Sequence, residues 1–165
     1  MNMKMERRDF LSKAAIASAA TLFSTNSLLS ATYPAKEKLG IALVGLGYYS
    51  TDLLAPALQL TEKAYLAGIV TGTPSKAETW KKKYNIPEKN IYNYQNFDQI
   101  ANNPDIDVVY VPLPNQLHFE WSVRALEAGK HVLCEKPLCL TAEQVARLCA
   151  VRDCSSVATT MGFSA

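Results

Sequence analysis

LGIALVGLGYYS, residues 39–50, is the stretch that decides the fold of this 165-residue chain. Its first half, residues 39–44, is a continuous apolar run of the kind that forms a strand buried on both faces of a parallel sheet. Its second half has the glycine spacing of dinucleotide-binding turns, G-x-G-x-x-G. Gly45 would allow the tight turn, Gly47 would let the backbone approach a pyrophosphate, and Ser50, in place of the third glycine, is small enough for close helix packing. An ordinary strand-to-helix turn is the alternative, and the position of the motif inside a strand–helix–strand unit argues against it.

Short β-branched runs alternate with helix patterns along the rest of the chain, and this order predicts the fold class. Strands are expected at residues 39–44, 64–71, 91–92, 107–111, 131–134 and 156–161. Helices are expected at residues 75–84, 117–128 and 141–151, with a first one after Gly47 that Pro56 would kink or shorten. Gly129 fits a left-handed helix end, and Thr141 with Gln144 fits a capping box. The alternation predicts an α/β fold, a Rossmann-type doubly wound parallel sheet.

The charge balance of the chain excludes some classes of function. Lys and Arg number 17 and Asp and Glu number 15, for a net charge of +2. The first 34 residues hold four of the bases and two of the acids, so the rest of the chain is electroneutral. A binder of nucleic acid or of an anionic membrane needs a basic surplus, so neither partner is expected. Because 48% of the residues are hydrophobic and no apolar run approaches the roughly 20 residues of a spanning helix, we expect a soluble globular domain behind a tail.

The first 34 residues have the three-part layout of an export signal. Residues 1–13 are polar and basic, residues 14–23 are mildly apolar and rich in Ala, and residues 24–31 are polar and small. Within them ERRDFLSK resembles the twin-arginine signal, with Glu6 where Ser or Thr is usual. An amphipathic N-terminal helix is the alternative. We therefore expect residues 1–34 to be a twin-arginine export signal, residues 35–165 to be the folded domain, and the protein to reach the periplasm without a lipid anchor.

The end of the second expected strand bears on which nicotinamide cofactor binds. NAD sites usually offer an acidic residue here to the adenosine ribose, and VTGTPSK, residues 70–76, contains none. A carboxylate would repel a 2′-phosphate, whereas hydroxyl groups and the charge of Lys76 would hold one. The hydroxyls are those of Thr71, Thr73 and Ser75. The sequence therefore favours NADP over NAD, unless Lys76 is only a solvated lysine in the first turn of a helix.

Two further motifs lie where later strands end, at the edge where open α/β sheets bind ligands. PLPNQLH, residues 112–118, follows the fourth expected strand, and CEKPL, residues 134–138, closes the fifth. A Glu-Lys pair directly after a buried strand is rarely a packing device, and Lys136 could donate to a carboxamide, a ribose hydroxyl or a substrate oxygen. His118 by itself is more often a helix N-terminal residue than a catalyst.

The four cysteines all lie in the last third of the chain, at Cys134, Cys139, Cys149 and Cys154. Export would permit disulfides, but folding in the cytoplasm before export would keep the thiols reduced. The spacing is also not that of a zinc site, which uses short paired intervals and usually His partners. We expect small buried residues or unpaired thiols, and no metal site.

These motifs, read together, resemble the glucose-fructose oxidoreductase (Gfo/Idh/MocA) family from about residue 39 to residue 162. The resemblance rests on GLGYYS, the LPNQLH loop, EAGKHV and the CEKP segment, and the leader and residues 96–115 are most similar to the glucose-fructose oxidoreductase branch. It implies that the pyrophosphate of bound NADP is lined by Gly45, Leu46, Gly47 and Tyr48, and its 2′-phosphate by Thr71, Ser75 and Lys76. It also implies that Pro112, Asn115 and His118 border the nicotinamide, and that Glu135 and Lys136 hold its ribose and carboxamide. In the family this Lys also helps to place the sugar hydroxyl that is oxidised, so Lys136 is the candidate catalytic residue.

Family members continue into a C-terminal α/β domain, whose antiparallel sheet carries the sugar site and the interface of homo-oligomers. Because this chain ends at Ala165, the resemblance implies that the second domain is absent here. We expect the NADP-binding N-terminal domain of an exported enzyme that transfers hydride between a sugar or polyol and NADP, with little or no activity by itself. The alternatives are the nucleotide-binding half of a nicotinamide-dependent glycosidase of the same family, and a non-catalytic remnant.

Overall fold

The computed structural model describes residues 36–155 and 157–161. The chain divides into two units, Met1–Lys36 and Glu37–Ala165, and every element described below belongs to the second. The predicted export signal, residues 1–34, lies outside the described residues and stays a prediction.

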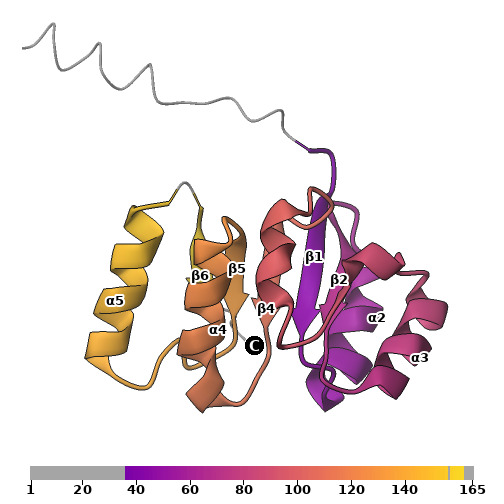
Figure 1. The fold of residues 1–165 in the computed structure, drawn as a ribbon, viewed down its shortest axis with the longest axis horizontal. Coiled ribbons are helices and arrows are strands. Elements are labelled where there is room, and N and C mark those ends of the chain that lie inside the picture. The colour runs from indigo at the N-terminus through magenta and orange to yellow at the C-terminus, as the bar shows by residue number, and fades with distance from the viewer. Residues whose placement is uncertain (1–35, 156, 162–165) are drawn as a thin grey trace, which may run out of the picture. The chain divides into compact units, whose positions relative to one another are not determined.

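Six parallel strands form one sheet in the order β3-β2-β1-β4-β5-β6 (Figure 1). The strands are β1 Leu39–Val44, β2 Ala64–Val70, β3 Ile91–Tyr92, β4 Val108–Val111, β5 His131–Cys134 and β6 Thr159–Met161. The order runs outward in both directions from the β1–β4 pair, which is the doubly wound Rossmann arrangement. The predicted fold class is confirmed, and each predicted strand is present.

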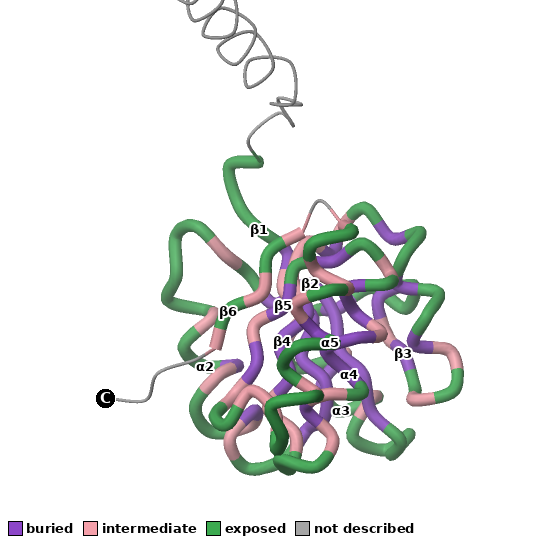
Figure 2. Tube along the Cα trace, turned by 90° about the vertical axis from the view of Figure 1, so that its left-hand side faces the viewer, coloured by how far each residue is buried: buried purple, intermediate pink, exposed green. Residues whose placement is uncertain are grey.

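Successive side chains of a strand point to opposite faces of the sheet, so apolar strands leave two apolar faces, and helices cover both. The helices are η1 Tyr49–Leu54, α2 Ala55–Leu58, α3 Pro74–Tyr84, η2 Glu88–Asn90, η3 Phe97–Asn102, α4 Asn115–Glu127 and α5 Ala142–Asp153. Ala42 and Val44 of β1 enter one apolar core together with residues of η3, α4 and α5. Leu43, between them, enters a second core with residues of α2 and α3. Figure 2 shows the result as buried residues concentrated in the central strands.

The segment after the glycine turn is not a regular helix. Tyr49–Leu54 forms a π-helix, and only Ala55–Leu58 continues as an α-helix, with Pro56 in its first turn. The helix is short, as expected, but Pro56 lies in the first turn of α2, where a proline fits, and the helix ends two residues after it. The π-helix and the short helices η2 and η3 had no clear periodicity to predict them.

Two predicted helix ends are present. Gly129 follows α4 with a φ angle of +70°, in the left-handed region that glycine adopts without strain. The Thr141 hydroxyl caps α5 by accepting a hydrogen bond of 3.2 Å from the Gln144 backbone N–H. The Gln144 side chain in turn accepts from the N–H of Leu140, one residue earlier than in a standard capping box.

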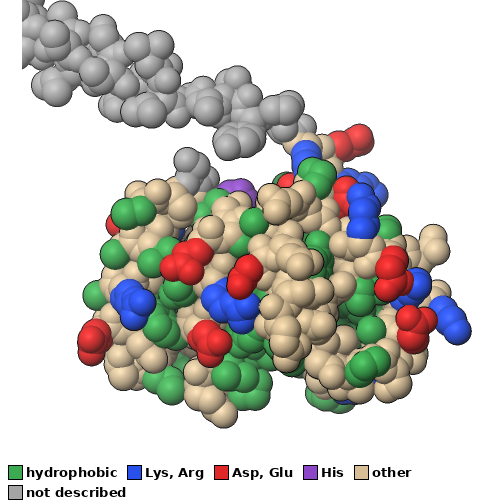
Figure 3. Space-filling model, viewed as in Figure 1, with side chains coloured by type: hydrophobic (Ala, Val, Ile, Leu, Met, Phe, Trp, Pro, Cys, Tyr) green, Lys and Arg blue, Asp and Glu red, His purple; other side chains and the backbone are tan. Residues whose placement is uncertain are grey.

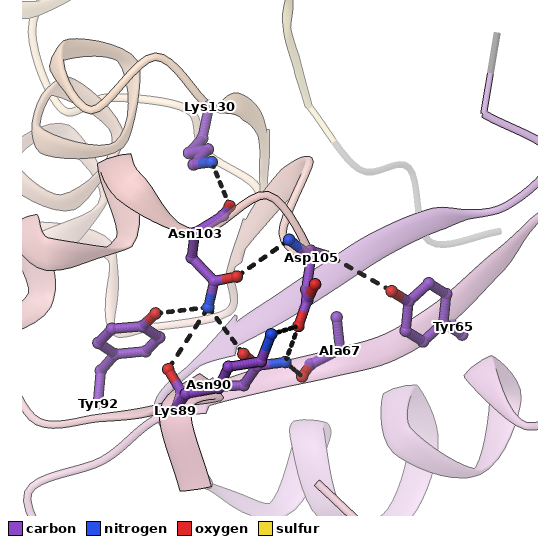
Figure 4. Close-up of polar contacts among 8 residues, drawn as sticks. All are labelled: Tyr65, Ala67, Lys89, Asn90, Tyr92, Asn103, Asp105 and Lys130. Carbon is purple, nitrogen blue, oxygen red and sulfur yellow. Dashed lines mark hydrogen bonds and ion pairs between the residues drawn. The ribbon is translucent and has the colours of Figure 1, made fainter. Parts of the chain in front are cut away.

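A buried polar cluster fastens the amino edge of the sheet (Figure 4). The side-chain amide of Asn103, in the loop before β4, donates to Asn90 Oδ1 and to the Tyr92 hydroxyl, both at 2.7 Å. The Asn103 carbonyl accepts a bond of 2.8 Å from Lys130 Nζ, and Asn90 donates to the carbonyl of Ala67 at 2.8 Å. Asn90, Asn103 and Lys130 are all buried, so each of these bonds satisfies a group that water does not reach.

Charged side chains of both signs are mixed on the surface. On the face drawn in Figure 3, Lys and Arg side chains lie among Asp and Glu side chains, in keeping with the balanced charge of the domain. Ion pairs join Lys89 to Asp105 at 2.7 Å and Arg124 to Asp98 at 3.0 Å. In the part of the chain that the structure describes, no helix is long and apolar enough to span a bilayer.

We expect Asn103→Ala to lower the free energy of unfolding by about 2 to 3 kcal/mol, because it leaves buried partners in the polar cluster without hydrogen bonds. Urea denaturation followed by circular dichroism measures the change. Asn102→Ala is the matched control, because the side chain of Asn102, next to Asn103 in the sequence, is exposed. This variant should lower the free energy of unfolding by less than about 0.5 kcal/mol. Equal losses in the two variants would show that the cluster does not stabilise the sheet.

Candidate functional site

The carboxyl ends of β1, β4 and β5 meet at one edge of the sheet, where the strand order reverses. β1 pairs with β2 on one side, Val44 opposite Val70, and with β4 on the other, Leu43 opposite Tyr110. Loops that leave neighbouring strands in opposite directions open a crevice, and open α/β sheets bind ligands there. The motifs at residues 45–50, 112–118 and 134–138 all follow strands at this edge.

Gly45 is required by both its backbone and its neighbours. Its φ angle is +87°, which L side chains rarely adopt. A Cβ at this position would lie 2.6 Å from Cδ2 of Leu113 and 3.7 Å from the hydroxyl of Tyr94. The glycine turn and the 112–118 loop are therefore in direct contact, and the apolar Leu113 side chain fills the space that a side chain at residue 45 would need.

Ser50 and Gly47 each have a distinct role in the turn. Ser50 is buried, and its hydroxyl donates to the carbonyl of Gly45 at 2.7 Å, a bond that a third glycine could not make. Gly47 faces open space, since a Cβ there would meet no heavy atom within 4 Å outside its chain neighbours. The packing of the protein thus gives no reason for glycine at residue 47. A pyrophosphate lying against this backbone would give one, so the turn fits a dinucleotide.

A cavity of about 420 Å³ opens beside Gly47, a size that suits a small-molecule ligand. Its walls are Leu46, Gly47, Tyr48, Thr51, Asp52, Ser75, Lys76, Thr79 and Trp80. Lys76 reaches from α3 to the turn, where its Nζ donates to the Leu46 carbonyl at 2.9 Å. The structure thus brings predicted pyrophosphate residues together with two of those predicted for the 2′-phosphate.

Thr71, the third residue predicted for the 2′-phosphate, has a different position. It is buried, and its hydroxyl accepts a hydrogen bond of 3.2 Å from the N–H of Thr73, so it shapes the turn between β2 and α3. Thr73 is the N-cap of α3 but makes no side-chain cap bond, and Ser75 and Lys76 are exposed in the first turn. Pro74 has no N–H, and the Lys76 N–H bonds to the Thr73 carbonyl at 3.1 Å, so the start of α3 offers the Ser75 backbone N–H next to the Lys76 ammonium group, a combination suited to an anion.

Residues 112–118 lead into α4, and some of their side chains are exposed while others are buried. Pro112 is half-buried and Asn115, the first residue of α4, is exposed. His118 is completely buried, with Nε2 at 2.6 Å from the Leu113 carbonyl and Nδ1 at 2.7 Å from the Pro137 carbonyl. Both ring nitrogens of this predicted cofactor residue thus contact the protein backbone.

Glu135 is held at the end of β5 by tyrosines. The Tyr110 hydroxyl donates a hydrogen bond to its carboxylate, and Tyr49 of η1 lies in the same group. Burial raises the pKa of Tyr110 well above its ordinary value, and the hydrogen bond to Glu135 and the negative charge of Glu135 raise it further. Burial and the charge of Glu135 also raise the pKa of Tyr49. Both phenols stay protonated at neutral pH, so they can donate to the carboxylate and orient it.

Lys136 is exposed next to this group, at the start of the segment after β5, and its peptide bond to Pro137 is cis. The neighbouring thiol is a poor nucleophile, because burial raises the pKa of Cys134 to about 11. Among the residues that the structure describes, no group of three or more His, Cys, Asp or Glu side chains could hold a metal ion. Lys136 itself is an exposed predicted residue at this edge, where its ammonium group can meet a substrate.

The sequence prediction missed several side chains of the site. Tyr94 packs against the backbone of Gly45 and Gly72 and, at 5.1 Å between ring centres, against Trp121. Asp52 lines the cavity that Lys76 borders. Tyr94 follows a strand at the ligand-binding edge, which was an available signal, but aromatic residues are too common in and near strands for position alone to single one out.

A protein-family model described as "Oxidoreductase family, NAD-binding Rossmann fold" (GFO_IDH_MocA) matches residues 39–163. The dTDP-3,4-didehydro-2,6-dideoxy-alpha-D-glucose 3-reductase of Saccharopolyspora spinosa is 35% identical over 113 residues, which is 68% of this chain and 32% of the relative. The chain spans about a third of the length of the curated relatives that it matches first.

Solved structures show the same similarity. Aldose-aldose oxidoreductase from Caulobacter crescentus, complexed with glycerol, has a TM-score of 0.74 and 43% sequence identity, over 76% of this chain and 38% of that one. KijD10, a 3-ketoreductase from Actinomadura kijaniata in complex with NADP, has a TM-score of 0.67 and 30% identity, over 76% of this chain and 39% of that one.

We expect Gly47→Val to weaken dinucleotide binding at least about tenfold, or 1.4 kcal/mol, with little loss of thermal stability, because the new side chain enters open space that the ligand would use. Fluorescence titration with NADPH and thermal unfolding measure the two effects. Gly45→Val is the contrasting variant and should unfold at clearly lower temperature, since it combines a strained φ angle with a clash against Leu113. Unchanged NADPH binding by Gly47→Val would place the pyrophosphate elsewhere.

Proposed function

Because the chain belongs to the Gfo/Idh/MocA family of oxidoreductases, which has an NAD-binding Rossmann fold, we propose that it binds NADP and serves hydride transfer to or from a sugar or polyol. The observation that carries the proposal is the bond from Lys76 Nζ to the Leu46 carbonyl. This bond holds a positive charge beside the glycine turn, in the wall of a cavity of ligand size.

The polar groups that line this cavity suit the phosphates of the cofactor. The pyrophosphate would lie along the open backbone at Gly47, and the 2′-phosphate would lie between Lys76 and the uncapped start of α3. A phosphate accepts hydrogen bonds from ammonium, hydroxyl and backbone N–H groups, and Lys76 and Ser75 supply all three types here. No acidic residue interrupts the chain from the end of β2 to Lys76, so the position that usually binds the NAD ribose holds no carboxylate.

Asp52 is the feature that favours NAD instead. It lines the same cavity from η1, and its carboxylate would repel a nearby 2′-phosphate. We propose NADP because Lys76 is anchored at the turn by its hydrogen bond of 2.9 Å to the Leu46 carbonyl, whereas Asp52 is an exposed side chain that solvent screens.

The nicotinamide end would lie at the carboxyl ends of β4 and β5. Glu135, oriented by Tyr110, would accept hydrogen bonds from ribose hydroxyls, and Asn115 is exposed at the start of α4 on the same edge. Bound NADP would supply the hydride chemistry. Lys136 would donate a hydrogen bond to the sugar oxygen at the reacting carbon, because its ammonium group is exposed directly after β5.

Similar proteins support a sugar or polyol as the substrate class. One is an aldose-aldose oxidoreductase whose structure contains glycerol, a small polyol, and another is a 3-reductase of a dTDP-linked dideoxyglucose derivative. Each matches this chain only over the Rossmann part, so the substrate class is proposed for the protein as a whole. In the family that the sequence resembles, the groups that accept the proton of the sugar hydroxyl belong to the second domain.

We further propose that residues 1–34 direct the protein to the twin-arginine export route. ERRDFLSK, residues 6–13, supports this, because paired arginines followed by a weakly apolar, Ala-rich stretch are typical of that signal. The destination would be the periplasm.

Lys76→Glu should weaken NADPH binding about tenfold to a hundredfold and NADH binding less than about threefold, because only NADPH has a 2′-phosphate for the lysine to hold. Isothermal titration of both cofactors measures the ratio. Lys82→Glu, on the exposed part of the same helix, makes the same charge change outside the cavity and should alter neither affinity more than about twofold. Equal losses for the two cofactors, or tighter NADH binding by the unaltered chain, would contradict NADP preference.

The export proposal is tested by the double variant Arg7→Lys, Arg8→Lys. We expect it to remain in the cytoplasm while the unaltered chain reaches the periplasm, because the route reads the paired arginines themselves and a lysine keeps only their charge. Cell fractionation and immunoblotting measure the distribution. The variant Lys4→Arg, Lys13→Arg is the control outside the pair. Equal export of the twin-arginine variant would refute this proposal alone and leave the cofactor site untouched.

A further inference from the structure

His118 joins the two loops that border the nicotinamide end. It lies one turn into α4, completely buried, between the carbonyl of Leu113 at 2.6 Å from Nε2 and the carbonyl of Pro137 at 2.7 Å from Nδ1. Leu113 belongs to the loop between β4 and α4, and Pro137 to the segment between β5 and α5. One imidazole ring therefore bridges segments that enter the site from neighbouring strands.

The chemistry of the two partners fixes the roles of the ring nitrogens. A backbone carbonyl oxygen can only accept a hydrogen bond, and a neutral imidazole has a single N–H to donate. At 2.6 to 2.7 Å, a bare nitrogen facing a carbonyl oxygen would bring two lone pairs together. We infer that His118 donates from both nitrogens, as an imidazolium, and thereby acts as a positioning residue that holds the two loops in their ligand-binding shape.

This role would act on the cofactor through other residues, and in that respect it rests on the proposed function. The Leu113 side chain, next to one accepting carbonyl, occupies the space beside Gly45 in the phosphate turn. Pro137, at the other, directly follows Lys136, the proposed substrate contact, and Glu135. A shift of either loop would move these groups, while the His118 ring itself is completely buried.

The two bonds can be observed directly by nuclear magnetic resonance of the 165-residue chain with ¹⁵N-labelled histidine. The chain has only two histidines, and His131 is an internal control because its Nδ1 accepts a bond of 2.9 Å from the N–H of Ala158. At pH 7.5, long-range ¹H–¹⁵N correlation should show two protonated ring nitrogens for His118 and an unprotonated Nδ1 for His131. A single protonated nitrogen in His118 would overturn the inference, whether or not the chain binds NADPH.

The positioning role is tested by His118→Gly, titrated with NADPH with and without added imidazole. We expect at least about tenfold weaker binding and a recovery of at least about threefold with imidazole, which can refill the vacated site and donate to both carbonyls. Leu126→Ala, a buried truncation elsewhere on α4, is the control for lost stability and should change affinity less than about threefold. Equal losses in both variants, or no recovery, would reject the role. Failure of the unaltered chain to bind NADPH would instead reject the proposed function.

Discussion

The ligand-binding edge depends on one close approach, between the backbone of Gly45 and the side chain of Leu113. The glycine is in the left-handed region and carries no side chain, so the loop after β4 can lie directly against the turn after β1. The Ser50 hydroxyl then satisfies the Gly45 carbonyl, which fixes the turn from its other side. Because both contacts are internal to the protein, the turn is shaped before any ligand arrives, and the backbone at Gly47 is left open toward the cavity.

The amino and carboxyl ends of the strands have different roles. At the amino edge, Asn90, Asn103 and Lys130 bury polar groups and pair them with one another and with the backbone, which stabilises the connections into β3, β4 and β5. At the carboxyl edge, Lys76 and Lys136 keep their charged groups at the surface, where a ligand can reach them. In this domain the buried polar cluster and the ligand-binding groups thus lie at opposite ends of the strands, and the carboxyl ends are where open α/β sheets bind ligands.

Sequence reasoning predicted the strands and the doubly wound fold class, because apolar runs and glycine spacing are local signals with few physical explanations. It also assigned Lys76 to the 2′-phosphate of NADP, because the strand before it ends without an acidic residue, and the structure brings this lysine to the glycine turn. It did not predict the π-helix after Tyr48, which no local pattern encodes, nor the links from Tyr110 to Glu135 and from His118 to Pro137. Those links join segments about 20 residues apart or more and arise only when neighbouring strands are aligned.

The central pairing of β1 with β4 also sets the order in which the domain can fold. The bond from the Gly40 N–H to the Asp107 carboxylate closes a loop of 67 residues, whereas the neighbouring pairs join strands through a single short crossover. Chain entropy opposes long closures, so the two strand–helix–strand halves should assemble first and meet along β1 and β4 last. Until they meet, each half exposes an unpaired strand edge, the kind of surface through which polypeptides aggregate. The seam that creates the ligand crevice is therefore also the point at which the newly made chain is most vulnerable.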